Sequence, residues 1–154
     1  MATEIKRPAK SLYDEDFYVW AEAQAQLLRE RRFNALDLEN LIEEVEGLAR
    51  SEKKEVLNNA SIVMEHLLKL QFSPATDPRA GWIDSVMEHR NRLELDLTPR
   101  LREILQDELP RVFQIARRTA ERSLRAHGED AAASALPATC PYTLDQITGD
   151  WWPG

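Results

Sequence analysis

Cysteine and glycine are scarce in this chain of 154 residues, which has a single cysteine and five glycines. One thiol, Cys140, excludes an internal disulfide framework and fits a reducing compartment, so we expect a cytoplasmic protein. Few glycines, 31% charged residues and the lack of long alternating apolar and polar runs all argue against β-sheet. The composition therefore predicts an all-α fold.

Long apolar runs are also missing, which excludes a membrane-spanning helix on sequence grounds. Lys6, Arg7 and Lys10 are basic, but no apolar stretch follows them, so we do not expect a signal peptide. The net charge of −7 argues against generic nucleic-acid binding, because neutralised phosphates drive that affinity.

The length favours a single domain with a sizeable core. Residues 1–12 lack periodicity and are predicted to be a flexible lead-in. Residues 13–154 are predicted to form one helical domain, which includes a C-terminal arm over residues 129–154.

The longest periodic stretch is 37–72, where apolar residues recur every three or four positions, as on one face of an α-helix. Asp37 is the predicted N-cap, and Ser73 precedes a proline that stops the helix, so we expect a helix over about 38–72. Gly47 is unfavourable inside a helix, but the unbroken apolar phase favours one kinked helix over two. The predicted buried face comprises Leu38, Leu41, Ile42, Val45, Leu48, Ala49, Glu52, Val56, Leu57, Ala60, Val63, Leu67, Leu68 and Leu70.

Shorter periodic stretches predict further helices, giving an irregular bundle of about five main helices around the long one. A helix from about Asp14 to Arg32 precedes it, and a helix over about 82–97 follows it. The short connector before the long helix favours an antiparallel pair. The expected inward residues of these two helices are Phe17, Trp20, Ala21, Gln24, Leu27 and Leu28 in the first, and Ile83, Val86, Arg90, Leu93 and Leu97 in the second.

The C-terminal third begins with Thr98 as an N-cap and Pro99 as the first helical residue. Pro110 must kink or restart this helix, and Gly128 is a plausible residue to end it. Thr143 and Gln146 have capping-box spacing, which predicts a short helix at the end of the arm. The expected inward residues of the long basic stretch are Leu101, Ile104, Leu105, Leu109, Val112, Phe113, Ala116, Ala120 and Leu124. At least one of the terminal residues Trp151 and Trp152 is expected to dock on the bundle.

Carboxylates at helical spacing are the first candidates for chemistry. Glu39, Glu43 and Glu46 follow one side of the long helix, where paired acids could bind a hard metal ion or transfer protons. Di-metal bundles supply Glu and His three residues apart, and no Glu precedes a histidine by three positions here. We therefore favour a solvated or arginine-paired face over a metal site.

Histidines, basic residues and the thiol provide weaker candidates. His66, His89 and His127 fall on three predicted helices and could converge on Zn²⁺, although isolated structural or surface roles are favoured. Basic residues from Arg111 to Arg125 could bind phosphate, but the acids of residues 37–46 offer them an internal partner. No basic residue next to Cys140 lowers its pKa, so a half-buried, unreactive thiol is expected.

Four blocks of sequence resemble a known bacterial family. They are YDEDFYVW at 13–20, LDLENLIEEVEGLARSEKKEV at 36–56, HLLKL at 66–70 and CPYTLDQI at 140–147. The chain resembles the family catalogued as domain of unknown function twenty-nine, and the resemblance implies a compact, soluble, all-helical bacterial domain. It supplies no activity, cofactor or catalytic residue. The resemblance does place Asp37, Glu39, Asn40, Glu43, Glu44, Arg50, Ser51 and Lys53 in a family motif.

These motif residues, with Glu46 and His66, are the candidate polar site, and they have a functional and a structural interpretation. In the structural one, carboxylates, Asn40 and basic side chains form a buried network that holds helices in register. The sequence contains no catalytic Ser or Cys signature motif and no glycine-rich phosphate loop. No catalytic, cofactor-binding or metal-binding residue is therefore predicted.

Three functional hypotheses follow. The first is a non-enzymatic cytoplasmic interaction or regulatory domain without a cofactor, whose partner is another protein or a second copy of the chain. The alternative is a small metal- or ligand-binding protein or enzyme that uses the Asp37–Lys53 motif or His66. The third is nucleic-acid binding through the row from Arg111 to Arg125, which the acidic net charge disfavours.

Overall fold

The computed structural model describes residues 11–154, which are helical and contain no strand. This part of the chain confirms the predicted all-α class. The chain divides into two compact units, Met1–Ala49 and Arg50–Gly154. Residues 1–10 of the predicted lead-in lie outside the described residues, and helix α1 already begins at Leu12. A single domain over residues 13–154 stays a prediction.

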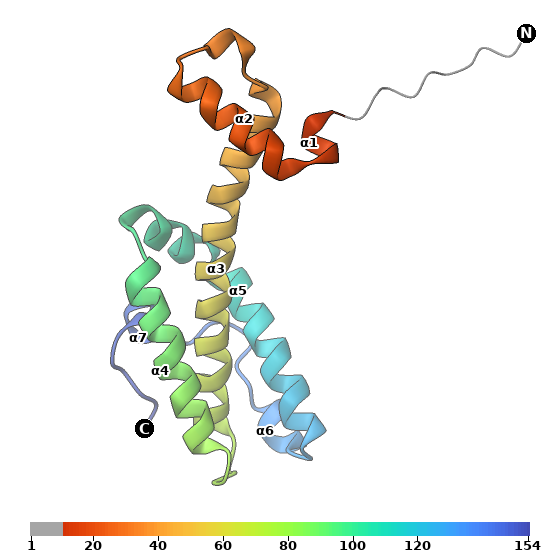
Figure 1. Cartoon of the computed structure of the whole chain (residues 1–154). Coiled ribbons are helices and arrows are strands. Elements are labelled where there is room, and N and C mark those ends of the chain that lie inside the picture. The colour runs from red at the N-terminus through yellow and green to blue at the C-terminus, as the bar shows by residue number, and fades with distance from the viewer. Residues whose placement is uncertain (1–10) are drawn as a thin grey trace, which may run out of the picture. The chain divides into compact units, whose positions relative to one another are not determined.

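The described part of the first unit contains α1 (Leu12–Glu15), α2 (Phe17–Arg29), the short 3₁₀ helix η1 (Phe33–Ala35) and the beginning of α3 (Figure 1). The prediction of one helix from Asp14 to Arg32 is wrong. Asp16 leaves the helical conformation, and its carboxylate accepts a hydrogen bond from the backbone N–H of Val19 at 3.1 Å. Asp16 therefore caps a second helix instead of continuing the first, since a short acidic side chain competes with helix propagation.

Helix α3 (Leu38–Phe72) has the predicted bounds and passes through Gly47 without a break. The predicted burial is wrong for its first half. All the buried residues of α3 lie between Val56 and Leu70, while Leu38, Ile42, Val45 and Leu48 are exposed. One amphipathic pattern therefore forms a core in the second half of the helix and a surface in the first.

The second unit adds α4 (Arg79–Asp96), α5 (Pro99–Ala126), α6 (Asp130–Ser134) and α7 (Leu144–Thr148). Figure 1 shows α4 and α5 beside the C-terminal half of α3. Their buried faces join α3 in a single apolar cluster that includes the fully buried Phe113, Met64 and Val86. The prediction that Ile83 is buried is wrong, because its side chain is exposed on α4.

Helix α5 follows its sequence signals closely. The Thr98 hydroxyl accepts from the N–H of Leu101 at 3.2 Å, which confirms the predicted N-cap. Figure 1 shows α5 changing direction along its length, as the missing N–H and bulky ring of Pro110 require. Gly128 has a φ of 77°, a left-handed conformation suited to glycine just beyond a helix end.

Arg90 holds the C-terminal arm to α4. Its guanidinium is buried and donates to the backbone carbonyls of Gln146, Ile147 and Trp151 at 2.6, 3.0 and 2.6 Å. The first two carbonyls belong to α7, whose predicted Thr143–Gln146 capping box is confirmed. Trp151 packs against the apolar cluster and the Trp152 ring lies over the Arg90 guanidinium, which confirms that at least one terminal tryptophan docks on the bundle.

Candidate functional site

Asp37 is the centre of a polar cluster that ties α2 to the start of α3. Its carboxylate accepts from Nε1 of Trp20 at 2.9 Å and from Nδ2 of Asn40 at 2.8 Å. Its backbone N–H donates to Oε1 of Gln24 at 2.7 Å. The bonds from Asn40 and Trp20 hold the pKa of Asp37 below its usual value, because they stabilise the ionised form. The carboxylate also caps α3 through the N–H of Asn40, as predicted.

A second tie joins α1 to α3. The Tyr13 hydroxyl donates to Oε1 of Glu44 at 2.5 Å, and this hydrogen bond is the main cause of a raised Tyr13 pKa. The Tyr13 ring makes an edge contact with the Trp20 ring at 4.8 Å between centroids. Tyr13 of α1 thus contacts α3 at residue 44, while Trp20 and Gln24 of α2 both bond to Asp37. These bonds do not fix the direction of α2 along α3, so the predicted antiparallel pair stays a prediction.

The first half of α3 exposes a stripe of large apolar side chains. Leu38 is 62% exposed, Ile42 50%, Val45 63% and Leu48 70%. At 3.6 residues per turn these four residues share one side of the helix, with Leu41 and Ala49 between them. Asp37 and Glu44, which bind α1 and α2, lie about a quarter turn to one side. We call these four residues the open face.

Nothing else in residues 11–49 covers the open face. Trp20 and Gln24 are the only buried residues in this part of the chain. Helix α2 also leaves Phe17 and Leu28 about half exposed, although they lie on the same side as Trp20 and were expected inside. The described part of the first unit is therefore an open layer of helices and not a closed bundle.

The charged residues of the predicted motif are spread along α3. Glu39, Glu43, Glu46, Arg50 and Ser51 are exposed, and Glu44 is half-buried against Tyr13. The Nζ atom of Lys53 lies 3.5 Å from the carboxylate of Glu108 on α5. The structure therefore brings together Asp37 and Asn40 but does not assemble the motif into one site.

Each of the three histidines has a hydrogen-bond partner, local for His66 and His127 and on another helix for His89. His66 and His127 donate from Nδ1 to backbone carbonyls four residues earlier, at 2.8 Å. His89 donates to Oδ1 of Asn59 at 2.7 Å, and partial burial, followed by the charge of Arg92, lowers its pKa. Within residues 11–154, no three His, Cys, Asp or Glu side chains are grouped to hold a metal ion.

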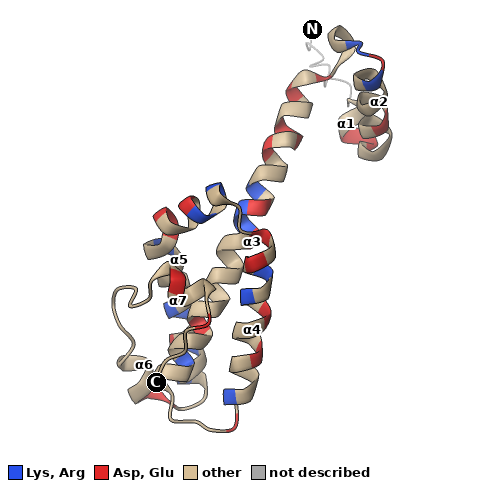
Figure 2. Ribbon diagram, turned by 90° about the vertical axis from the view of Figure 1, so that its left-hand side faces the viewer, with Lys and Arg blue, Asp and Glu red and all other residues tan. Residues whose placement is uncertain are grey.

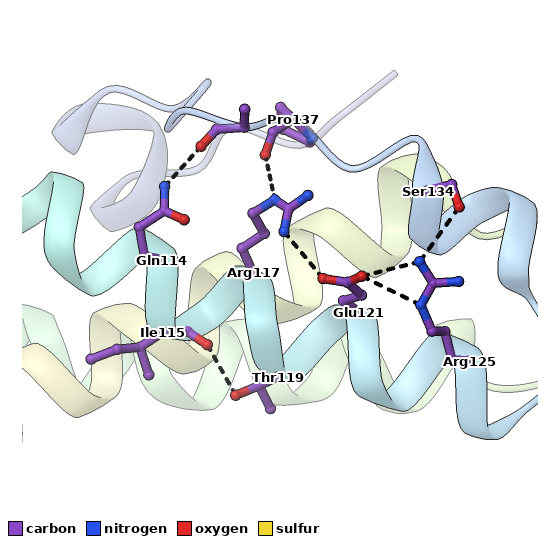
Figure 3. Close-up of polar contacts among 9 residues, drawn as sticks. Gln114, Ile115, Arg117, Thr119, Glu121, Arg125, Ser134 and Pro137 are labelled. Carbon is purple, nitrogen blue, oxygen red and sulfur yellow. Dashed lines mark hydrogen bonds and ion pairs between the residues drawn. The ribbon is translucent and has the colours of Figure 1, made fainter.

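The arginine row of α5 is paired locally. Figure 3 shows Arg117 between the carbonyl of Pro137 and the carboxylate of Glu121, which also binds Arg125. Arg111 binds Glu108 one turn away, at 2.6 Å. Arg111, Arg117 and Arg125 therefore have carboxylate partners on their own helix, Glu108 and Glu121, while the expected pairing with the acids of 37–46 stays a prediction. The bonds of Arg117 hold the C-terminal arm on α5.

Cys140 is half-buried, and burial raises the pKa of its thiol, as expected for an unreactive cysteine. A hollow of about 820 Å³ in the second unit is lined by Trp82, Leu124, His127 and Glu129, among others. In the described part of the chain every buried side-chain nitrogen and oxygen has a hydrogen-bond partner. The hollow therefore contains no unpaired buried polar group that would mark a ligand.

Sequence reasoning missed the exposure of the open face, because it assigned these residues to the core. The preceding stretch offers four large apolar residues on its expected inward side, Phe17, Trp20, Leu27 and Leu28, which match the open face in number. The structure nevertheless leaves Phe17 and Leu28 about half exposed, so no signal in the sequence identified the uncovered stripe.

The fold and this face define an all-helical protein with an irregular bundle around one long helix. The chain belongs to the family described as Domain of unknown function DUF29, which matches residues 12–152. This confirms the resemblance found in the sequence. No helix in residues 11–154 combines the length and apolar character needed to cross a membrane.

A solved structure provides a second comparison. The chain is similar to an alpha-helical protein of unknown function (rru_a3208) from Rhodospirillum rubrum ATCC 11170. The two share 24% sequence identity with a TM-score of 0.66, over 92% of this chain and 90% of the other. At this identity the likeness supports the fold alone. A comparison with curated proteins finds no match.

Proposed function

We propose that this protein is a non-enzymatic interaction domain that binds another protein through the open face of α3. The observation that carries the proposal is the contrast within residues 11–49, which bury only Trp20 and Gln24 but expose the whole open face. Contiguous exposed apolar side chains on a protein surface are typical of interaction sites. Fewer than about 40 residues seldom form a stable fold without added support, and a partner is one such support.

The polar residues near the open face support a binding role rather than a catalytic one. Asp37 already accepts hydrogen bonds from Trp20 and Asn40, and Glu44 accepts one from Tyr13. These carboxylates position helices, and their bonds leave α1 and α2 fixed to one side of the stripe. The free, half-buried Cys140 suits a reducing compartment, so we place this interaction in the cytoplasm.

Photo-crosslinking in the cells that make the protein tests the proposal. A photoreactive amino acid in place of Val45 should give an adduct with a protein, whether another chain or a second copy. The same amino acid in place of Leu95, which is 85% exposed on α4, is the matched control and should give much less. Equal adducts at both positions, or none at Val45, would contradict the proposal.

An enzymatic assay is the second test. If the purified protein converted a substrate and lost that activity on Glu43→Ala, the non-enzymatic part of the proposal would fail. Unchanged adduct formation in Glu43→Ala, with no turnover by either protein, is the expected result.

A further inference from the structure

A basic groove lies between α3 and α5 in the second unit. It has a volume of about 310 Å³, and its apolar floor is formed by the buried Leu57 and Val112 and the exposed Ile115. Small-molecule sites span about 300–1,000 Å³, so this groove has room for a few side chains of a partner rather than for a large cofactor. The basic residues that line it are Arg50, Lys53, Lys54 and Arg111.

The groove already holds one carboxylate, that of Glu108. Its oxygens lie 3.5 Å from Nζ of Lys53 and 2.6 Å from Nη2 of Arg111. The hydrogen bond from Arg111 is the main cause of the lowered pKa of Glu108, so these cations stabilise an ionised carboxylate. Lys54 has no hydrogen bond or ion pair within residues 11–154. Glu108 therefore offsets part of the positive charge, and Lys54 is available for a further carboxylate.

The basic character is local to this part of the chain, whose net charge is −7. Figure 2 shows Lys and Arg near the middle of α3, after the acidic residues of its first half. The groove therefore differs in charge from the helix surface that precedes it, and it favours an acidic partner.

Helix α5 continues the basic surface beyond the groove. Figure 3 shows Arg117 pointing to the C-terminal arm, with Ile115 on the other side of α5. On the arm side Arg117 is paired with Glu121. Arg118 and Arg122 are exposed and have no hydrogen bond or ion pair among the described residues. Spacings of four, three and four place the following residues on the groove side of α5: Arg111, Ile115, Arg118 and Arg122.

We propose that this groove binds an acidic peptide segment of another protein, with an apolar side chain on the floor and carboxylates on both sides of it. Arg111 and Arg118, which flank Ile115 along α5, bind these carboxylates together with Lys54. Recognition of acidic motifs by clustered arginines and insertion of apolar side chains into grooves are both common in peptide binding. The site lies in the second unit, so the inference goes beyond the proposed function and does not depend on it.

The lining of the groove favours a peptide over a nucleic acid. Within residues 11–154 no aromatic side chain lines it, whereas proteins that bind single strands use aromatic rings to stack the bases. The floor of Leu57, Val112 and Ile115 gains nothing from a phosphate, because burial against an apolar surface removes water from a charged group. An apolar side chain between carboxylates matches both the floor and the cations.

Fluorescence anisotropy of a labelled peptide with the full-length protein tests the proposal. From Arg111 to Arg122 the helix extends roughly 16 Å at 1.5 Å per residue, and seven extended residues reach at most about 25 Å. The probe is therefore a heptapeptide with Leu between three Glu on each side. It should bind in low salt and more weakly as ionic strength rises, because salt screens exposed charges.

The control probe has Gln in place of every Glu and should bind at least tenfold more weakly. Equal binding of the two probes, or no saturable binding of the acidic one, would overturn the proposal.

Lys54→Glu tests the location of the site. It should weaken binding of the acidic probe about tenfold, because it replaces an attraction by a repulsion. Lys54 is exposed and unpaired, so helicity by circular dichroism should match the wild type. Arg100→Glu makes the same change in net charge at an exposed position of the second unit, and should change binding less than twofold. An equal loss in both variants would mean that the probe responds to overall charge and that the groove is not the site.

Ile115→Ala tests the apolar floor, with a second acidic probe that has Ala in place of Leu. The substitution should weaken the Leu probe severalfold and leave the Ala probe unchanged, because only the Leu side chain is long enough to pack on Ile115. The same loss for both probes would contradict the placement of an apolar side chain in the groove.

Competition distinguishes the other classes of ligand. Unlabelled acidic peptide should displace the probe at a lower concentration than a deoxythymidine oligonucleotide of equal charge, or than vesicles of phosphatidylcholine and phosphatidylglycerol. Stronger displacement by the oligonucleotide or by the vesicles would replace the peptide by a nucleic acid or a membrane surface, and the inference would fail. The crosslink at Val45 is measured separately, so this failure would leave the proposed function standing.

Discussion

The two halves of α3 have the same amphipathic pattern but different surroundings. In residues 50–154 the pattern enters an apolar cluster in which Val63, Met64 and Leu67 are fully buried. In residues 11–49 the same spacing leaves Leu38 and Val45 more than 60% exposed. Periodicity therefore specifies which side of a helix is apolar, while the neighbouring elements decide whether that side is covered.

The neighbours of the two halves differ in what they can contribute. Helix α5 presents buried Leu, Val, Phe and Ala residues over most of its length, with Pro110 turning it so that both segments contribute. Helix α2 buries only Trp20 and the polar Gln24, and both side chains form hydrogen bonds with Asp37. The first unit is thus held by polar bonds at its edge, and the second by a filled apolar centre.

The largest expected effect comes from opening the centre of the second unit. Phe113→Ala removes a fully buried ring and should lower the free energy of unfolding by about 3–5 kcal/mol, because the cavity collapses only in part. Phe17→Ala in the first unit is the matched control and should cost about 1 kcal/mol or less, since Phe17 is half exposed. Urea unfolding measures both. Equal losses would remove the contrast between the two regions.

Removal of the Arg90 guanidinium should have the next largest effect. Arg90→Met leaves the carbonyls of Gln146, Ile147 and Trp151 without their donor and should cost about 3 kcal/mol. Tryptophan fluorescence should change as well, because Trp152 stacks on this group. Arg92→Met, an exposed residue paired with Glu88 on the same helix, should change stability by about 0.5 kcal/mol at most. A comparable loss in both variants would show that the carbonyl contacts contribute little.

Lowering the pH should destabilise the first unit before the second, because Asp37 stabilises the first unit in its ionised form. The folded pKa of Asp37 is lowered, so its contribution to stability is present above the ordinary aspartate value of about 3.9. That contribution is lost as the pH falls through the lower folded pKa. Hydrogen exchange of amides near Trp20 should therefore accelerate on acidification, and Asp37→Ala should accelerate it already at neutral pH. Slow exchange in the variant would mean that Gln24 and the aromatic contacts suffice.

Substitution of His89 should have the smallest effect. Here the folded state favours the neutral form of the side chain, whereas at Asp37 it favours the charged form. Burial, with Arg92 next in importance, lowers the pKa of His89, so the folded state favours the neutral ring. Below the ordinary histidine pKa of about 6.5 the unfolded chain binds the proton more readily, and stability should fall with decreasing pH. His89→Gln should weaken this dependence between about pH 6.5 and 5. An unchanged pH profile would show that other groups cause it.

Much of the fold could be predicted from local signals. Asp37, Thr98 and Thr143 act as the expected caps, and Gly128 ends α5 in the expected conformation. These signals are local because a capping side chain satisfies backbone groups only two or three residues away. The break at Asp16 was missed, since the same acidic residue can lie within a helix or cap a new one.

The candidate site was predictable only in part. The polar motif drew attention to Asp37 and Asn40, which do form a cluster with Trp20, a residue assigned only to packing. The role of Arg90 was missed, because its three acceptors lie more than fifty residues away in the C-terminal arm. Long-range acceptors leave no spacing pattern in a single sequence.

The sequence by itself determined the helical class, the bounds of α3 and the side of each helix that is apolar, because these depend on contacts within a few residues. Only the tertiary structure decided which apolar sides are buried. It covers α3 from Val56 to Leu70 and leaves Leu38 to Leu48 open, because burial depends on the area that other elements bring to each half.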